Sequence, residues 1–343
     1  MFADLAGNEL VKRSLKRLIA DGRVPNALLF TGRDAIGKRR FAIELARAFL
    51  CNETSDSEGC GKCPACTRAA TFHEPDRERK DEFERVNFSE HGDVGMIVPY
   101  RRSILVAAIR DLEREAFFRP FEARARFFII DDADRMNDSA SNALLKTLEE
   151  PPASSHIVLI TSRPDRLMRT IRSRCQTIRF APVPTEAIEK QIAAQGHTSN
   201  SEITSRFADG SLGRAISLDT EFFLERREMM FGALEAAILK TDIGSLLQVA
   251  ERMNDAKNKD VFDDSIDILE SLIRDLWLVS INAAGSLVNI DQRSRLETLS
   301  TAIRPKEISA WLEEIETLRQ NLDVNINRKL AADALFVTIA GCG

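Results

Sequence analysis

The sequence predicts a nucleotide-binding α/β domain followed by an all-α region, and three observations support this fold class. Strand and helix patterns alternate between residues 9 and 180, which is typical of a mostly parallel sheet with helices on both faces. A phosphate-binding loop follows the first strand pattern, at residues 32–39. After a proline-containing linker at 181–185, the strand patterns end and only helical patterns follow.

Short apolar runs and helical periodicity predict the individual elements. Strands are expected at Ala27–Phe30, Arg126–Ile130, Ile157–Thr161 and Thr177–Phe180. Helices are expected at Glu9–Asp21, Arg39–Leu50, Arg102–Phe117 and Ser139–Glu149. The last of these helices is predicted to have Asp138 as its N-cap and to end before Pro151.

These patterns divide the chain into three expected domains. Residues 1–181 form the α/β core, residues 182–219 a small helical lid, and residues 220–343 a helical domain. Within the core, a cysteine-rich module occupies residues 51–66. The charged segment 74–100 is expected to be an exposed, solvated insertion because it lacks apolar periodicity.

Composition excludes several classes of protein. The chain has 343 residues, of which 44% are hydrophobic and 29% charged, as in an ordinary globular protein. Its formal net charge of −5 argues against a protein that wraps nucleic acid with its whole surface. No run reaches the roughly 18 apolar residues of a membrane span, and the N-terminus lacks the pattern of a signal peptide. A cytoplasmic location without a membrane partner is therefore expected.

The phosphate-binding loop has lost one essential residue. Gly32, Gly37 and Lys38 match the motif G-x-x-x-x-G-K, but the next position holds Arg39 instead of Ser or Thr. The hydroxyl at that position normally coordinates Mg²⁺, which a guanidinium cannot do. Backbone N–H groups and Lys38 can still cradle an anion. The loop therefore predicts no hydrolysis by this chain and makes ATP binding doubtful.

A second nucleotide signature is an apolar strand, 127–130, followed by Asp131 and Asp132. In this Walker B arrangement, Asp131 would hold Mg²⁺, often through water. Asp132 stands where active proteins of this class have a glutamate, and its shorter side chain would lie further from the attacking water. Two exposed carboxylates at a strand end would give the same pattern, but its place after a phosphate loop favours the Walker B interpretation.

Four of the six cysteines lie within sixteen residues, at Cys51, Cys60, Cys63 and Cys66. In a cytosolic chain this spacing predicts a metal site, and four thiolates close a tetrahedron around a structural Zn²⁺. An iron–sulfur cluster or an empty, vestigial site are the alternatives. The other two, Cys175 and Cys342, are expected to be small buried or incidental residues.

A basic motif, Thr170-Ile171-Arg172-Ser173-Arg174-Cys175, follows the third predicted strand. By itself it describes a basic helix end exposed to solvent. It also describes an arginine finger, which reaches the γ-phosphate of a nucleotide held by a neighbouring subunit. Its position shortly after residues 159–162 favours the second interpretation.

One long motif indicates a family. The run S-N-A-L-L-K-T-L-E-E-P-P at residues 141–152, followed by Ser173-Arg174-Cys175, resembles the bacterial clamp-loader AAA+ proteins. The four-cysteine insertion after the P-loop helix is shared there by the motor and delta-prime subunits of DNA polymerase III, and the broken P-loop is similar to the delta-prime family. The resemblance covers residues 2–181 strongly, is weaker across the lid, and over the C-terminal helices rests on helical pattern and position.

This resemblance implies a stator in DNA replication. Arg174 would reach the ATP of the adjacent motor subunit, Thr161 or Ser162 would mark sensor 1, and Arg214 would be the sensor-2 arginine. The C-terminal helices would join the collar of a hetero-pentamer with motor (tau/gamma) and delta subunits, which loads a sliding clamp onto primer–template DNA. The degenerate nucleotide site would comprise Gly32, Gly37, Lys38, Asp131, Asp132 and Arg214, and the four clustered cysteines would hold structural Zn²⁺.

Two other functions compete with this one. The first is an active ATPase, the motor subunit of the same clamp loader, which should carry Ser or Thr at position 39. The second is a zinc-dependent nucleic-acid-binding module that uses an inactive nucleotide-binding core. The net charge of −5, one Tyr and two Trp leave that module few stacking surfaces for bases.

Overall fold

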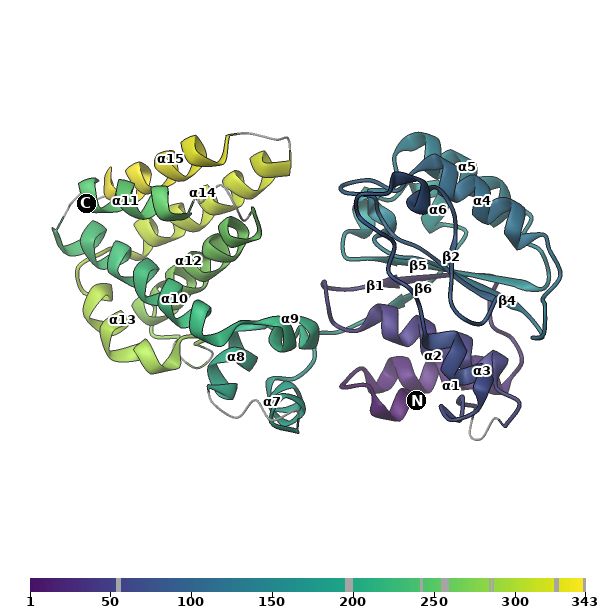
Figure 1. The fold of residues 1–343 in the computed structure, drawn as a ribbon. Coiled ribbons are helices and arrows are strands. Elements are labelled where there is room, and N and C mark those ends of the chain that lie inside the picture. Colours follow the sequence, from purple (N-terminus) through teal and green to yellow (C-terminus); the bar gives the residue numbers. More distant parts are fainter. Residues whose placement is uncertain are drawn as a thin grey trace. The chain divides into compact units, whose positions relative to one another are not determined.

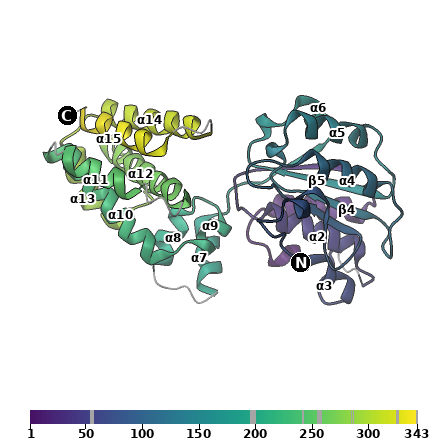
Figure 2. The same cartoon turned by 45° about the horizontal axis from the view of Figure 1, so that its top comes forward.

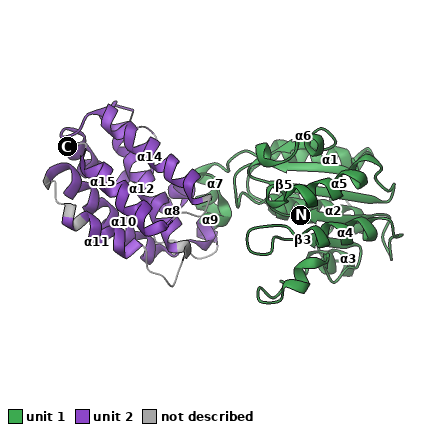
Figure 3. Ribbon diagram, turned by 90° about the horizontal axis from the view of Figure 1, so that it is seen from above, with its two compact units in different colours: residues 1–191, 209–214 green, residues 192–208, 215–343 purple. Residues whose placement is uncertain are grey.

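The structure of the chain is a computed structural model, and it describes residues 1–53, 57–194, 200–240, 243–253, 259–283, 285, 287–323 and 327–341. Cys342 lies outside these residues. The chain forms two compact units (Figure 3). Unit 1 comprises Met1–Gln191 and Asp209–Arg214, and unit 2 comprises Ile192–Ala208 and Ala215–Gly343. The predicted lid segment 182–219 contributes to both units, so the three-domain division stays a prediction.

Unit 1 is built on a six-stranded sheet with the order β2-β3-β4-β5-β1-β6 (Figure 1). All neighbouring strands run parallel except β2, which pairs antiparallel with β3 at one edge. The strands are β1 (Ala27–Thr31), β2 (Asn87–Phe88), β3 (Val94–Ile97), β4 (Arg126–Ile130), β5 (Ser155–Thr161) and β6 (Gln176–Arg179).

Helices cover both faces of this sheet (Figures 1 and 2). Alternate side chains of β4 point to opposite faces, as the period of two requires. Phe127 and Ile129 join the core beneath α1 and α2, whereas Phe128 and Ile130 join the core beneath α4 and α5. The helices of unit 1 are α1 (Glu9–Ala20), α2 (Lys38–Leu50), α3 (Pro64–Ala70), α4 (Val106–Ala116), α5 (Asp138–Glu149) and α6 (Arg169–Arg172).

The four strands and four helices predicted for this unit all form. Strand β4 has the predicted bounds, and the other elements have shifted ends. The predicted helix 102–117 begins only at Val106. The N-cap of α5 is Asn137, whose side chain accepts a hydrogen bond from the backbone N–H of Ala140, so the assignment of Asp138 was wrong by one residue. Asp138 instead lies in the first turn, where its charge favours the positive end of the helix.

The expectation of a solvated loop across 74–100 was wrong over residues 87–88 and 94–97. Strand β3 is buried along its whole length between β2 and β4. It was missed because it has only four residues and one of them is a glycine. Gly95 is needed there, because a Cβ atom at this position would lie 2.3 Å from Cγ1 of Val86.

Unit 2 contains no named strand within its described residues and consists of packed helices. Its core is formed by large apolar side chains that include Phe231, Phe262, Trp311 and Phe336, each almost fully buried. The segment from the linker onward contains α7 (Thr185–Ala194), α8 (Ser201–Phe207), α9 (Leu212–Ser217), α10 (Thr220–Glu235), a π-helix (Ala236–Lys240), α11 (Ile243–Met253), α12 (Lys259–Ser280), α13 (Arg293–Ser300), α14 (Pro305–Asp323) and α15 (Arg328–Gly341).

Across the described part of the chain, no helix has both the length and the apolar character needed to cross a membrane. The cytoplasmic location stays a prediction.

Candidate functional site

The phosphate-binding loop lies between β1 and α2, where a parallel sheet presents the carboxyl ends of its strands. Gly37 is the N-cap of α2 and has φ +98°, in the left-handed region that favours glycine. Lys38 is 5% exposed, and its Nζ donates hydrogen bonds to the carbonyl oxygens of Gly32, at 2.6 Å, and Arg33. Burial lowers the pKa of Lys38, while nearby aspartates act in the opposite sense. The lysine is thus folded back onto its own loop.

Arg39 bridges the two nucleotide motifs. Its guanidinium lies 3.9 Å from a carboxylate oxygen of Asp131 and 3.1 Å from one of Glu74. Asp131 is the carboxylate that would hold Mg²⁺, so the arginine places a positive charge beside the group that the metal would contact. The sequence showed that Arg39 cannot bind a metal, but it did not show this ion pair. Glu74 was also missed, because it belongs to a segment predicted to be solvated.

The pKa values of both aspartates of the predicted Walker B motif are raised. Burial raises the pKa of Asp131, and the adjacent Asp132 raises it further, whereas Arg39 lowers it. Burial also raises the pKa of Asp132, which lies 3.2 Å from the guanidinium of Arg135. Asp132 adopts a left-handed conformation with φ +48°. The carboxylate at the position of the catalytic acid is therefore turned toward a neighbouring arginine of its own chain.

A cavity of about 450 Å³ collects these groups. Gly37, Lys38, Arg39, Asp131, Asp132 and Ser162 are among the residues that line it. Gly32 is not among the lining residues, although its carbonyl oxygen accepts a hydrogen bond from Lys38. Of the two sensor-1 candidates, Thr161 is buried and donates a hydrogen bond to Asp134 at 2.5 Å, whereas Ser162 lines the cavity.

The sensor-2 candidate Arg214 is not among the lining residues. Its segment does reach the phosphate loop, because the backbone N–H of Gly213 donates to the carbonyl oxygen of Ala35 at 2.9 Å. Asp209, at the start of the same segment, forms an ion pair with Arg33. The structure therefore brings the predicted sensor-2 segment to the loop, and Arg214 is not among the residues that line the cavity.

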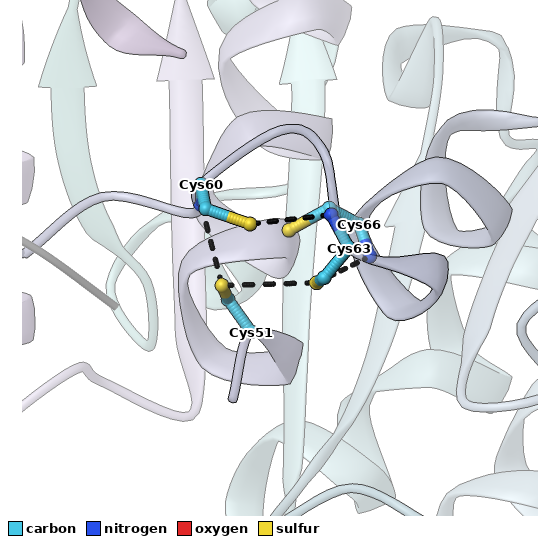
Figure 4. Close-up of side chains that lie close together, drawn as sticks. All are labelled: Cys51, Cys60, Cys63 and Cys66. Carbon is cyan, nitrogen blue, oxygen red and sulfur yellow. Dashed lines mark hydrogen bonds between the residues drawn. The ribbon is translucent and has the colours of Figure 1, made fainter. Parts of the chain in front are cut away.

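The four clustered cysteines converge on one point (Figure 4). Their sulfur atoms all lie within 4.8 Å of one another, and those of Cys51 and Cys63 are 3.9 Å apart. Four sulfurs at 2.3 Å from a tetrahedral Zn²⁺ would be about 3.8 Å apart, so the arrangement fits a closed four-thiolate site. Four protein ligands would leave no open position for water or substrate, which is the pattern of structural and not of catalytic zinc sites.

Backbone N–H groups support the sulfurs of this cluster. The N–H groups of Lys62 and Cys63 point to the sulfur of Cys60 and lower its pKa to about 7, which favours the thiolate that a metal requires. Burial raises the pKa of the Cys66 thiol. Cys63 is the N-cap of α3, followed by Pro64 at the first helical position. The isolated Cys175 is buried.

Arg174 follows the end of α6 on the surface of unit 1. Its guanidinium is about one-third exposed, lies 2.6 Å from a carboxylate oxygen of Glu149, and donates to the carbonyl oxygen of Thr170 at 2.9 Å. Glu149 belongs to the long motif 141–152, and its contact with Arg174 links the two parts of the family signature. The pairing orients the arginine side chain without burying it.

Comparisons with known proteins find similar sequences along nearly the whole chain. The family model described as DNA polymerase III, delta subunit matches residues 7–184, and the corresponding C-terminal model matches residues 221–338. DNA polymerase III subunit delta' of Bacillus subtilis is 28% identical over 92% of this chain and 93% of its own length. The delta' subunit of Escherichia coli K12 is 26% identical over 96% and 94%.

Other members of the same polymerase machinery are also similar. The gamma/tau subunit of Mycobacterium tuberculosis H37Rv is 30% identical, but over 56% of this chain and 30% of its own length. A solved gamma subunit-related protein of Thermotoga maritima covers 96% of this chain and 98% of its own, with 18% identity and a TM-score of 0.39. Since one family model alone matches more than half of the sequence and the delta' relatives span nearly all of it, the chain belongs to the delta-prime family of DNA polymerase III clamp-loader subunits.

Proposed function

We propose that this chain is a stator that does not hydrolyse ATP and that supplies Arg174 to the ATP site of a neighbouring motor subunit. The observation that carries the proposal is the contact between Arg39 and Asp131, 3.9 Å apart. A cation supplied by the chain itself faces the carboxylate that would otherwise hold Mg²⁺. Without a metal bridging the phosphates, the charge of the transition state is not neutralised.

The arginine finger itself is supported by position and exposure. Arg174 is partly exposed, pairs with the carboxylate of Glu149 and donates to the carbonyl oxygen of Thr170. A neighbour's phosphate can replace the carboxylate without disturbing the core. An arginine supplied in trans is worth about 10³–10⁵ in rate in nucleotide hydrolases. In the assembly, ATP bound by the motor would draw Arg174 toward the γ-phosphate and so couple nucleotide state to clamp opening.

Reconstitution tests this role. The chain is combined with the motor (tau/gamma) and delta subunits of its proposed hetero-pentamer, and ATP hydrolysis is measured with sliding clamp and primer–template DNA. Arg174→Ala is expected to abolish turnover at the site it serves. Arg172→Ala is the matched control, because Arg172 is the last residue of α6, lies two positions before Arg174, is similarly exposed and pairs with Asp165. Equal effects of the two variants would contradict the arginine-finger role.

An active motor subunit is the second candidate, and the retained nucleotide cavity favours it. Gly37, Lys38 and Asp131 still line a space of about 450 Å³. An assay of ATP hydrolysis by the isolated chain distinguishes the two functions. Hydrolysis of ATP by the chain alone, at a rate that Lys38→Ala removes, would support the motor and contradict the stator.

The metal is proposed to be Zn²⁺ held by Cys51, Cys60, Cys63 and Cys66. Zinc accepts four thiolates in a tetrahedron and needs no redox chemistry, which suits a structural role. Elemental analysis of protein purified without added metal should find one zinc per chain. Iron and sulfide in equal amounts, with visible absorption, would indicate a cluster instead.

Exposed apolar side chains in unit 1 support a role in an assembly. Phe117, Phe118 and Phe121, in and around the turn that follows α4, are 62%, 52% and 77% exposed. Exposed apolar side chains this close in sequence are the kind of surface that protein interaction sites use. The three residues lie between α4 and β4, away from the phosphate loop in sequence, so a partner there and a nucleotide would use different segments.

A further inference from the structure

The amino edge of the sheet in unit 1 collects the ends of three helices. Helices α4, α5 and α6 lead into the parallel strands β4, β5 and β6 respectively, so their C-terminal ends lie where those strands begin. Their apolar side chains share one core on the same face of the sheet, and Figure 1 shows the three helices together on that face. The nucleotide cavity lies at the opposite edge, where the strands end.

Contacts along this edge place the end of α4 on the same surface as Arg174. The hydroxyl of Ser155, the first residue of β5, donates to the carbonyl oxygen of Ala116, the last residue of α4, at 2.6 Å. Phe117 follows directly. Helix α5 packs between α4 and α6, and Glu149 at its end pairs with Arg174. The start of β6, which Arg174 precedes, is two strand spacings from the start of β5, or about 10 Å.

The turn after α4, which carries the exposed phenylalanines, has a fixed backbone. The fully buried carboxylate of Asp93 accepts hydrogen bonds from three consecutive backbone N–H groups, those of residues 121–123, at 2.8 to 3.1 Å. Glu122 is held by two hydrogen bonds from Arg68 of α3, at 2.8 and 3.0 Å. A partner that binds this turn therefore has little backbone to order, which lowers the free-energy cost of association.

Charge indicates the kind of partner. Both carboxylates in the segment 114–124, Glu115 and Glu122, are paired with arginines elsewhere in unit 1. The exposed Arg119 and Arg124 form no ion pair with any residue that the structure describes. Aromatic and arginine side chains are enriched in protein interfaces, and charges across an interface are complementary. The turn therefore suits a protein surface with an apolar pocket bordered by carboxylates.

We propose that the turn 117–124 anchors the same motor subunit whose ATP site receives Arg174, with its phenylalanines in an apolar pocket and its unpaired arginines facing carboxylates of that subunit. A small folded domain is about 30 Å across, so a subunit that brings a nucleotide to Arg174 is wide enough to cover the turn as well. The proposal rests on the proposed function, because Arg174 identifies the neighbour. It adds the surface that holds the two subunits together.

Calorimetric titration of the chain with purified motor subunit tests the anchor. Phe117→Ala is expected to weaken binding by roughly tenfold or more. Arg124→Glu is expected to weaken it in low salt and less so in high salt, because salt screens exposed charges. Leu10→Ala and Arg13→Glu are the matched controls, since both residues are exposed on α1, which covers the other face of the sheet. All four side chains are exposed, so the variants should keep the wild-type melting temperature.

ATP turnover of the reconstituted assembly separates the anchor from the arginine finger. Phe117→Ala should lower turnover when the chain is limiting, and turnover should recover as its concentration rises. Arg174→Ala should bind the motor without nucleotide but should not recover at any concentration. Equal affinities of Phe117→Ala and Leu10→Ala for the motor would overturn the anchor, as would a turn that binds single-stranded DNA and not the motor. Turnover that survives Arg174→Ala would instead contradict the stator role.

Discussion

Replacing Arg39 by threonine should give this chain a magnesium-dependent response to ATP. The substitution removes a guanidinium that lies 3.9 Å from Asp131 and 3.1 Å from Glu74. It also restores the hydroxyl that a phosphate-binding loop uses to coordinate Mg²⁺. Lys38, Gly37 and the carboxylate of Asp131 remain in place around the cavity.

The structure sets the size of the effect on stability. Two unit charges about 4 Å apart attract by about 4 kcal/mol at the effective dielectric constant of a protein surface. Arg39 and Glu74 are 36% and 74% exposed, however, so solvent screening reduces each pair to about 1 kcal/mol or less. Arg39→Thr should therefore fold normally. Its gain is in binding, where we expect ATP affinity at least tenfold higher with Mg²⁺ than without, a difference of about 1.4 kcal/mol.

Isothermal titration of the variant and the wild-type chain with ATP, with and without Mg²⁺, measures this gain. Arg40→Thr is the matched control, since Arg40 is exposed, lines the same cavity and is the next residue along α2. If Arg40→Thr produced the same magnesium dependence, the effect would come from lost positive charge in general. If Arg39→Thr produced none, the contact with Asp131 would not be what prevents metal binding.

Three further predictions test other parts of the structure. Glu149→Ala removes the carboxylate that orients Arg174, and should lower turnover of the reconstituted assembly by roughly tenfold while leaving the melting temperature of the chain nearly unchanged, because the pair is partly exposed. Burial lowers the pKa of His156 below 6.5, so the neutral imidazole stabilises the fold fully above pH 6.5, and this stabilisation is lost as the pH falls below that value. Urea unfolding at pH 7.5 and 5.5 should show a lower free energy of unfolding at the acidic pH. His156→Gln should reduce this difference, whereas His73→Gln, at an exposed histidine, should not. Removing the metal from the four cysteines with a chelator should lower the melting temperature by on the order of 10 °C, with recovery on adding zinc, whereas an unchanged melting curve would indicate an empty site.

Much of unit 1 could be predicted because its signals are local. The phosphate loop, the apolar run 127–130 and the cysteine spacing each depend on neighbouring residues, and the structure places them as expected at strand ends and in one cluster. Strand β3 could not be found in this way. Its four residues are held between β2 and β4, so its conformation comes from neighbours that are distant in sequence.

The ion pairs of the candidate sites could not be predicted either, because their partners are distant in sequence. Arg39 and Asp131 are separated by more than ninety positions in the chain, and they meet because α2 begins and β4 ends at the same edge of the sheet. Glu149 and Arg174 meet because α5 and α6 pack on one face. A motif specifies which residue types are present, whereas a partner across the sheet is specified only by the topology.

On the proposed function, two arginines have opposite roles: Arg39 prevents metal binding in the chain's own cavity, and Arg174 serves the ATP site of a neighbour. A ligand can shift a conformational equilibrium only as far as its affinities for the two states differ. In the chain's own cavity, the charge of Asp131 is already paired with Arg39, and Lys38 already donates a hydrogen bond to its own loop. Binding of ATP there would therefore change the conformation of the chain little. Arg174 pairs with one partly exposed carboxylate, beside its hydrogen bond to the carbonyl oxygen of Thr170, and can exchange that carboxylate for a neighbour's phosphate. The chain would therefore keep one conformation while the neighbouring site switches, which is what a fixed part of a moving assembly requires.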